Sequence, residues 1–128
     1  MAKAPKIDAR MARFVIEDLR RRRIPVDGLL KEVSLNKSDL ASPEGRIPYA
    51  PVIHLIERAA TDNRNFVKKG VSWALRSIGH RNAALHAASV ATATRLAASA
   101  DASARWIGKD ALRDLMRAQV LKRVAERQ

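Results

Sequence analysis

Two short stretches of this sequence place a tryptophan beside several basic side chains at helical spacing. The first is NFVKKGVSWALRSIGHRN, residues 65–82, and the second is ARWIGKDALRDL, residues 104–115. An indole ring can stack on a nucleic-acid base, while lysine and arginine bind the phosphates beside it. The residues that we expect to contact nucleic acid are Arg64, Lys68, Lys69, Trp73, Arg76, Arg81, Trp106, Lys109 and Arg113.

The tryptophans also have a purely structural interpretation. A large aromatic side chain on a helix often packs against a neighbouring helix, where it contributes to stability. Trp73 and Trp106 could serve in both ways, because such rings are often half buried. The sequence leaves both roles open.

The distribution of charge indicates a polyanionic partner. The chain has 128 residues and a formal net charge of +12. Residues 1–64 contain 13 basic and 9 acidic side chains, whereas residues 65–128 contain 12 and 4. Because such a surface attracts polyanions by releasing counterions, we expect nucleic acid as the partner, with duplex DNA first. The alternative is a basic helical domain that has no such partner.

Residues that could catalyse a reaction are few. The sequence has no cysteine, which excludes disulfides and thiol nucleophiles. His80 and His86 are six residues apart with no acid near them in sequence, which matches no metal-ligand spacing. We therefore expect no metal and no cofactor, and we assign no catalytic residue. Asp110 is expected to form an ion pair with a basic neighbour on its own helix, Lys109, Arg113 or Arg117.

Helical periodicity gives the first tryptophan stretch two faces. At 100° per residue, one arc of apolar side chains is the expected core face, and a second strip lies about a quarter turn away. Two such faces are typical of a helix in a stacked array. The core arc consists of Val67, Val71, Ala74, Leu75 and Ile78, and the second strip of Phe66, Gly70, Trp73 and Ser77, bordered by Lys69 and Arg76.

The other elements that the pattern predicts are also helices. Residues 1–6 are expected to be a frayed end, and residues 41–48, which contain two prolines and a glycine, are the clearest loop. The first helix has Met11, Phe14, Val15, Ile16 and Leu19 as its apolar stripe. The expected helices run from an Asp8 cap to about residue 22, over 25–33, 34–40, 49–60 and 65–79, from an Asn82 cap to about 99, and from Asp101 or Ser103 to 115, with residues 120–127 as a basic, partly frayed continuation.

The expected fold is therefore all-α, a helical bundle or a short HEAT-like helical stack of about six to seven helices. Residues 1–61 and 62–128 are its two segments, packed as one body. The start of the chain lacks the apolar core of a signal peptide, and the least charged run still contains His86 and Arg95. We expect a cytoplasmic protein with no membrane partner.

The first half contains a helix, an Ile-Pro turn followed by Leu-Leu, a Leu-x-x-x-Asp-Leu turn, and SPEGRIPY before another helix. In this order, residues 8–60 resemble the N-terminal ligand-sensing or dimerisation domain of one branch of AraC-type transcription regulators. The resemblance implies a ligand cavity near Arg46, Tyr49 and His54. Nothing similar to the paired helix-turn-helix domain of those regulators follows.

The second half contains DNRNFVKKGVSWALRSIGHRN, an alanine-rich helix, and then ARWIGKDALRDL. These elements, over about residues 62–117, are similar to the C-terminal HEAT-like repeats of bacterial DNA alkylation repair proteins. The resemblance implies a relation to glycosylases that remove alkylated bases from duplex DNA on a concave basic surface, with Trp73 at the position of a tryptophan that faces the lesion. An earlier Trp-and-Asp segment, whose carboxylate assists departure of the base in that family, is absent here.

Three hypotheses follow. The first is a DNA-binding helical protein related to DNA alkylation repair enzymes, which contacts duplex phosphates and has little or no glycosylase activity. The second is a ligand-sensing or dimerisation module of a transcription regulator. The third is an inactive fusion or a truncated chain whose parts only pack together. If the protein is an enzyme, its reaction is removal of alkylated bases from DNA.

Overall fold

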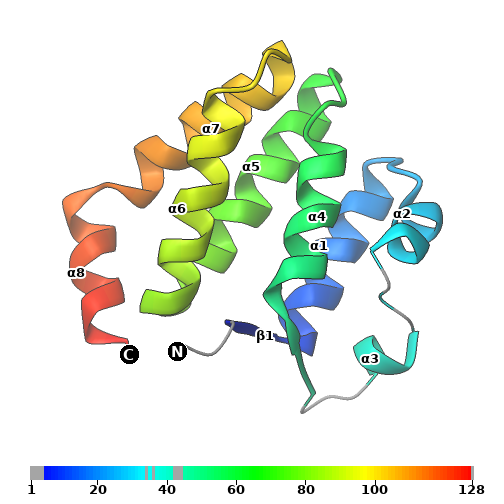
Figure 1. Ribbon diagram of the computed structural model, residues 1–128, viewed down its shortest axis with the longest axis horizontal. Coiled ribbons are helices and arrows are strands. Elements are labelled where there is room, and N and C mark those ends of the chain that lie inside the picture. The colour runs from blue at the N-terminus through cyan, green and yellow to red at the C-terminus, as the bar shows by residue number, and fades with distance from the viewer. Residues whose placement is uncertain (1–4, 34, 36, 42–44, 128) are drawn as a thin grey trace.

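The fold is seen in a computed structural model, which describes residues 5–33, 35, 37–41 and 45–127. The predicted all-α class is confirmed (Figure 1). The described helices are α1 (Ala9–Arg21), α2 (Val26–Glu32), α3 (Lys37–Ala41), α4 (Tyr49–Ala59), α5 (Asn65–Gly79), α6 (Ala83–Ala97), α7 (Ala102–Leu115) and α8 (Ala118–Glu126).

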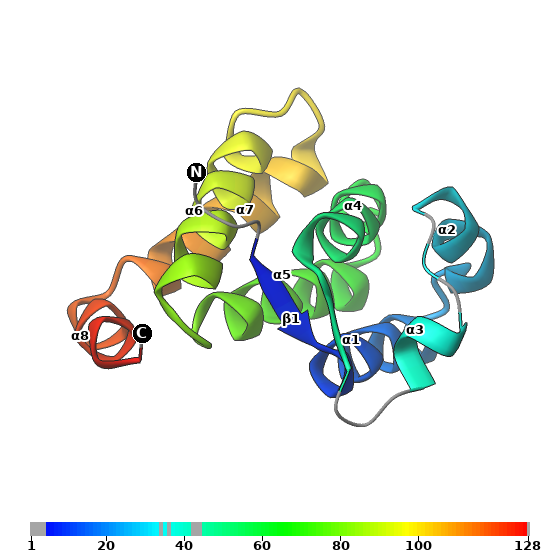
Figure 2. The same cartoon turned by 60° about the horizontal axis from the view of Figure 1, so that its bottom comes forward.

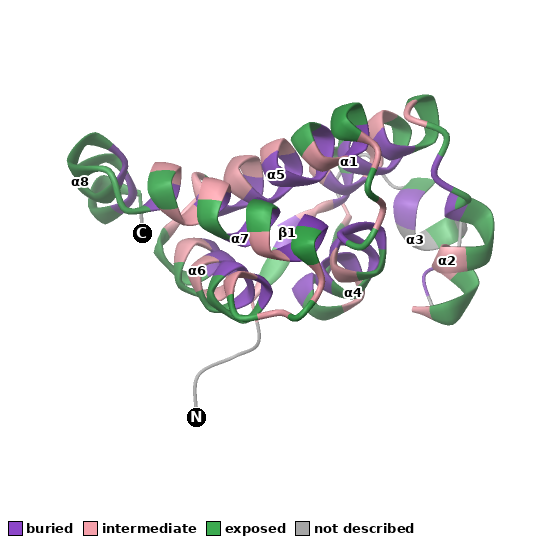
Figure 3. Ribbon diagram, turned by 90° about the horizontal axis from the view of Figure 1, so that it is seen from above, coloured by how far each residue is buried: buried purple, intermediate pink, exposed green. Residues whose placement is uncertain are grey.

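Helix α5 lies in the middle of the stack. It packs against α1 on one side and α7 on the other, while α4 and α6 cover its inner face (Figures 1 and 3). Helices α2 and α3 lie at one end of the molecule and α8 lies at the other (Figure 1). The helix that carries the first tryptophan is therefore in contact with both halves of the chain.

Three helices begin at side-chain caps. The carboxylate of Asp8 accepts a hydrogen bond from Arg10 N at 2.7 Å, and Asn82 accepts one from Leu85 N at 2.9 Å. At the start of α7 the cap is Asp101 rather than Ser103, since its carboxylate accepts from the backbone N–H three residues later. Such caps fix where a helix starts and each contributes about 1 kcal/mol.

A two-stranded sheet joins the N-terminus to the segment before α4. Strand β1 (Lys6–Asp8) pairs antiparallel with β2 (Arg46–Pro48), and Ile7 lies opposite Ile47 (Figure 2). Both isoleucines are buried. The expected frayed end at residue 6 and the expected loop over 46–48 were therefore wrong. Strands of three residues are too short to produce a recognisable alternating pattern. Residues 1–4 and 42–44 lie outside the described residues.

One hydrophobic cluster extends from Ile7 in β1 to Leu115 in α7. The predicted core arc of α5 is confirmed, since all five of its side chains are fully buried. Helices α6 and α7 approach each other closely at Gly108, where a Cβ atom would lie 2.5 Å from the carbonyl oxygen of Ala93 and nearer still to Ala97 N. Small residues thus allow the contact between these two helices.

Among the described residues, no helix has both the length and the apolar character that crossing a membrane requires. The division of the chain at residue 61 stays a prediction.

Candidate nucleic-acid surface

Three strips on the outward half of α5 form the candidate surface. At 100° per residue, Lys69 and Arg76 lie within about 20° of each other and form the outermost strip. Ser72 lies on the side that faces α7, and Trp73 and Ser77 lie on the side that faces α1. We call the strip with Lys69 and Arg76 the ridge, since it separates two different contacts of the same helix.

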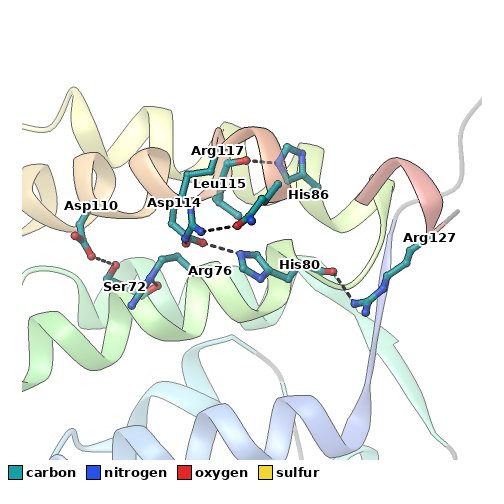
Figure 4. Close-up of polar contacts among 10 residues, drawn as sticks. Ser72, Arg76, His80, His86, Asp110, Asp114, Leu115, Arg117 and Arg127 are labelled. Carbon is teal, nitrogen blue, oxygen red and sulfur yellow. Dashed lines mark hydrogen bonds and ion pairs between the residues drawn. The ribbon is translucent and has the colours of Figure 1, made fainter. Parts of the chain in front are cut away.

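On the α7 side, α5 is joined to its neighbour by short polar contacts, which we call the seam (Figure 4). The hydroxyl of Ser72 donates to Oδ2 of Asp110 at 2.6 Å. At the C-terminal end of α5, Nε2 of His80 lies 2.6 Å from Oδ2 of Asp114. Only 27% of the Asp110 side chain and 13% of the Asp114 side chain are exposed. Both carboxylates therefore hold the two helices together.

The sequence predicted an ion pair for Asp110 within its own helix, and the structure adds contacts between α5 and α7. The predicted ion pair of Asp110 with Arg113 is present at 3.6 Å, but the hydrogen bond from Ser72 is much shorter. His80 has no acid near it in sequence, whereas the fold supplies Asp114 from 34 residues away. Asp114 also pairs with Arg117 at 3.1 Å. Sequence spacing could not reveal contacts between separate helices.

Trp106 is in contact with α5 as well. The ammonium of Lys68 lies 5.4 Å from the centroid of a Trp106 ring, which is the geometry of a cation–π contact. The tryptophan is 39% exposed. Both interpretations of this side chain thus remain: it contacts a neighbouring helix and it presents part of its indole to solvent.

On the α1 side, α5 borders a cavity of about 440 Å³, which we call the α1–α5 cavity. Trp73 contacts Phe14 of α1 here, with ring centroids 5.3 Å apart and an angle of 50° between the rings. Phe14, expected in the buried stripe of the first helix, is instead 53% exposed. The cavity is lined by Asp8, Arg10, Met11, Phe14, Trp73, Ser77 and Arg81.

Asp8 brings a carboxylate to this cavity, because it is both the last residue of β1 and the cap of α1. Hydrogen bonds from the backbone N–H and then the side chain of Arg10 lower the pKa of the Asp8 carboxyl below its ordinary value, and the charge of Arg81 acts in the same direction. The carboxylate is therefore ionised at neutral pH. Sequence reasoning missed Asp8 and Phe14 as site residues, since only the fold brings them beside Trp73.

The predicted phosphate-binding residues differ in how their charge is engaged. Arg64 pairs with Asp62 at 2.8 Å and also lies over the ring of Phe66. Arg113 pairs with Asp110. Within the part of the chain that the structure describes, no ion pair is found for the remaining arginines and lysines of the ridge and its ends, which are Lys69, Arg76, Arg81 and Lys109. No acid neutralises any of the four in that part of the chain, while the charge of Arg81 acts on Asp8 and Nε of Arg76 donates to Ser72 O at 3.4 Å.

The residues expected to form a regulator-type cavity are not gathered at one place. His54 borders a small cavity of about 180 Å³ with Glu32, Val33, Glu57 and Arg58. Tyr49 instead is buried against α6, where its hydroxyl lies 3.5 Å from Ser89 Oγ. Arg46 is on strand β2. Among the described residues there is also no cluster of three histidine or acidic side chains that could hold a metal ion.

Comparison with known proteins gives one match. A family model described as DNA alkylation repair enzyme matches residues 30–115, from α2 to the end of α7. No curated protein and no solved structure matches the chain. The matched range includes all of α5 and α7, and it also takes in half of the segment compared with transcription regulators. The regulator resemblance stays a prediction.

Proposed function

Since the chain belongs to the DNA alkylation repair enzyme family, we propose that it binds duplex DNA through the phosphates along the ridge of α5 and the adjacent edge of α7. The observation that carries the proposal is the set of unpaired cations there. Lys69, Arg76 and Lys109 have no ion pair within the described residues, whereas Arg20, Arg58 and Arg95 are neutralised by acids, and other unpaired cations, such as Lys31 of α2, lie on other helices.

The spacing of these cations supports contact with a phosphate backbone. Lys69 and Arg76 are seven residues apart on one face of α5, which corresponds to a rise of about 10 Å along the helix. Lys109 lies on α7, the helix that the seam joins to α5. Cations in such a row can contact several phosphates at once, and each contact releases condensed counterions.

The proposal includes little or no glycosylase activity. Removal of a base from DNA needs a carboxylate beside the sugar, and that carboxylate must lie within reach of the reacting atoms. Asp110 and Asp114 are engaged by Ser72 and His80 and are mostly covered. Neither is free to approach a substrate without breaking the seam, and the carboxylate of Asp8 beside Trp73 is engaged by Arg10 as the cap of α1.

A titration at several salt concentrations tests the DNA contact. A fluorescently labelled, fully paired duplex is titrated with the wild type, with Lys69→Ala and with Lys109→Ala, and Lys31→Ala serves as the control. Lys31 is an exposed cation of α2, remote from the ridge in sequence. Lys69→Ala and Lys109→Ala should each make the slope of log K against log salt about 0.9 less steep, because one phosphate contact is lost. Absence of binding at low salt, or an equal change in Lys31→Ala, would sink the proposal.

The catalytic part needs its own assay. The protein is incubated at high concentration with methylated duplex DNA, and released methylpurine is measured by chromatography. We expect no release above the rate of the DNA alone. Release that disappears in Trp73→Ala would show that the protein is a glycosylase and would overturn this part of the proposal.

A further inference from the structure

We propose that the turn between α7 and α8 is a docking site for a partner protein, which presents an amphipathic helix with an apolar stripe and acidic flanks. This inference goes beyond DNA binding and does not depend on it. The site, which we call the C-terminal edge, has two exposed apolar side chains at its centre, Met116 and Leu121, and basic side chains around them.

The centre of the C-terminal edge consists of large aliphatic side chains in contact with water. Met116, the C-cap of α7, is 52% exposed, and Leu121 in the first turns of α8 is 40% exposed. Among the described residues, every other exposed large apolar side chain is aromatic. Covering Met116 and Leu121 with apolar groups is favourable, and the flexible methionine can adapt to the shape of a partner.

The packing of α8 leaves Leu121 outside the core. Helix α8 packs inward through Val120 and Val124, which are both buried. Its C-terminal end is joined to the start of α6, where Ala83 N donates to Arg127 O at 3.3 Å (Figure 1). At 100° per residue, Leu121 lies about 60–100° around the helix from the two valines. The contacts that hold α8 in place therefore do not use the side chain of Leu121.

The charges around the C-terminal edge are mostly positive. Residues 102–128 contain seven basic and three acidic side chains. Two of the acids, Asp110 and Asp114, are held in the seam on the side of α7 that faces α5, which leaves one acid outside it. Lys122 and Arg123 of α8 form no ion pair within the described part of the chain. An apolar partner surface with acidic flanks would therefore be complementary to this edge in charge as well.

The same charges argue against a second copy of this chain as the occupant. The chain has a formal net charge of +12. Its exposed aromatic side chains also have cations beside them: the guanidinium of Arg64 lies 5.3 Å from the ring centroid of Phe66. The ammonium of Lys68 lies 5.4 Å from that of Trp106. Two copies would bring cations together at these places, which is unfavourable. An amphipathic helix of another protein, with leucines on one face and glutamates beside them, provides the complementary surface.

Binding of a designed peptide tests the proposal. The probe is a fluorescein-labelled peptide of about 18 residues, long enough to form a helix, with leucines at i, i+3, i+4 and i+7 and glutamates on both flanks. A second peptide has the same composition, but its leucines are spread around the helix. In anisotropy titrations with the full chain, the amphipathic peptide should bind about 10-fold tighter than the scrambled one, because its leucines cover Met116 and Leu121.

Matched variants assign this preference to the C-terminal edge. Met116→Ser and Leu121→Ser should each reduce the preference for the amphipathic peptide to below about 3-fold. Phe66→Ser is the control, because Phe66 is 45% exposed but lies on α5, and this variant should keep the preference. Lys122→Gln should weaken binding of both peptides about 2-fold, whereas Lys31→Gln on α2 should leave it unchanged.

Each other occupant gives a different result. If the two peptides bind equally, or neither binds, the edge does not recognise an apolar stripe and the proposal is wrong. If Met116→Ser instead weakens binding of a paired DNA duplex while neither peptide is preferred, the edge belongs to the DNA surface. A dimer of the wild type in sedimentation that Leu121→Ser converts to a monomer would identify a second copy as the occupant and overturn the proposal. Absence of DNA binding at low salt would overturn only the proposed function.

Discussion

Helix α5 meets its two neighbours in the outer layer in opposite ways. Toward α7 it makes hydrogen bonds of 2.6 Å between side chains that are largely covered. Toward α1 it presents a tryptophan to an exposed phenylalanine, beside an open cavity. The first contact holds the helix in position and the second leaves room for a ligand. A single helix thus combines a structural side with a side suited to binding.

Two glycines, one in α5 and one in the contact between α6 and α7, differ in what surrounds them. A Cβ atom at Gly70 of α5 would meet the side chain of Arg22, with Cζ at 2.7 Å, and a long side chain can move away. A Cβ atom at Gly108 of α7 would meet backbone atoms of Ala93 and Ala97 in α6, which cannot move without shifting the helix. The contact between α7 and α6 is therefore fixed by backbone packing, whereas at Gly70 only the Arg22 side chain, which is held by Asp18 and Phe66 O, has to move.

The largest expected effect comes from an added methyl group at this backbone contact. Gly108→Ala should lower the free energy of unfolding by about 3 kcal/mol, because overpacking forces α6 and α7 apart. Urea unfolding measures it. Gly28→Ala is the matched control, since nothing lies within 4 Å of a Cβ there, and it should be neutral or slightly stabilising. Gly70→Ala should fall between the two. Equal effects at Gly70 and Gly108 would contradict the difference between a contact with a side chain and a contact with a backbone.

Breaking the seam should have the next largest effect. Asp114→Ala leaves His80 and Arg117 without their acceptor and should cost about 2 kcal/mol, the value for hydrogen bonds to a charged group. Asp27→Ala removes a surface ion pair with Arg20, in which the Asp27 side chain is 74% exposed, and should change stability by less than about 0.5 kcal/mol. If Asp114→Ala lowers the free energy of unfolding no more than Asp27→Ala does, the seam does not hold α5 against α7.

The charge of the cavity carboxylate should appear in the pH dependence of stability. The folded-state pKa of Asp8 is lowered, so its contribution is present above the unfolded value of 3.8 and is lost as pH falls through the lower folded value. Asp8→Asn keeps a capping oxygen but carries no charge. We expect it to be about 0.5 kcal/mol less stable at pH 7, because the helix N-terminus favours a negative charge, and the difference should shrink as pH falls below 3.8 and the folded carboxyl becomes protonated. Urea unfolding across this range checks the expectation, and a constant difference would contradict it.

The smallest effect concerns the cation–π contact between Lys68 and Trp106. A double-mutant cycle with Lys68→Met and Trp106→Leu should give a coupling energy of about 0.5 kcal/mol, since the site is partly exposed. Thermal or urea unfolding of the four proteins provides it. A coupling energy near zero would show that the contact between Lys68 and Trp106 does not help to join α5 to α7.

Features that depend on neighbouring residues in sequence were predictable. The buried arc of α5 follows from its 3.6-residue period, and the caps Asp8 and Asn82 follow from residue type just before an apolar pattern. The family relation was also found from residues 62–117, since α5 and α7 carry its motifs. Local chemistry was sufficient for each of these predictions.

The polar contacts of the site were not predictable, because they join residues distant in sequence. Ser72 and Asp110 are 38 residues apart, and Phe14 and Trp73 come from different halves of the chain. The exposure of Phe14 depends on which part of α1 the stack covers, and periodicity alone assigned it to the core. The proposed DNA-binding residues could be named from type and spacing, but which of them are neutralised by acids required the fold.

The short β1–β2 pair makes one wall of the cavity depend on a contact about 40 residues away in sequence. Ala9 N donates to Gly45 O at 2.9 Å, and Tyr49 N donates to Pro5 O at 3.0 Å. These two bonds flank the ladder that holds Asp8 in place. Because Ile7 and Ile47 of this ladder are buried, opening it exposes core side chains, and amide hydrogen exchange at Ala9 and Tyr49 should report how often the cavity loses that wall. A ligand in the cavity should then slow exchange at these two amides, although neither Ala9 nor Tyr49 lines the cavity.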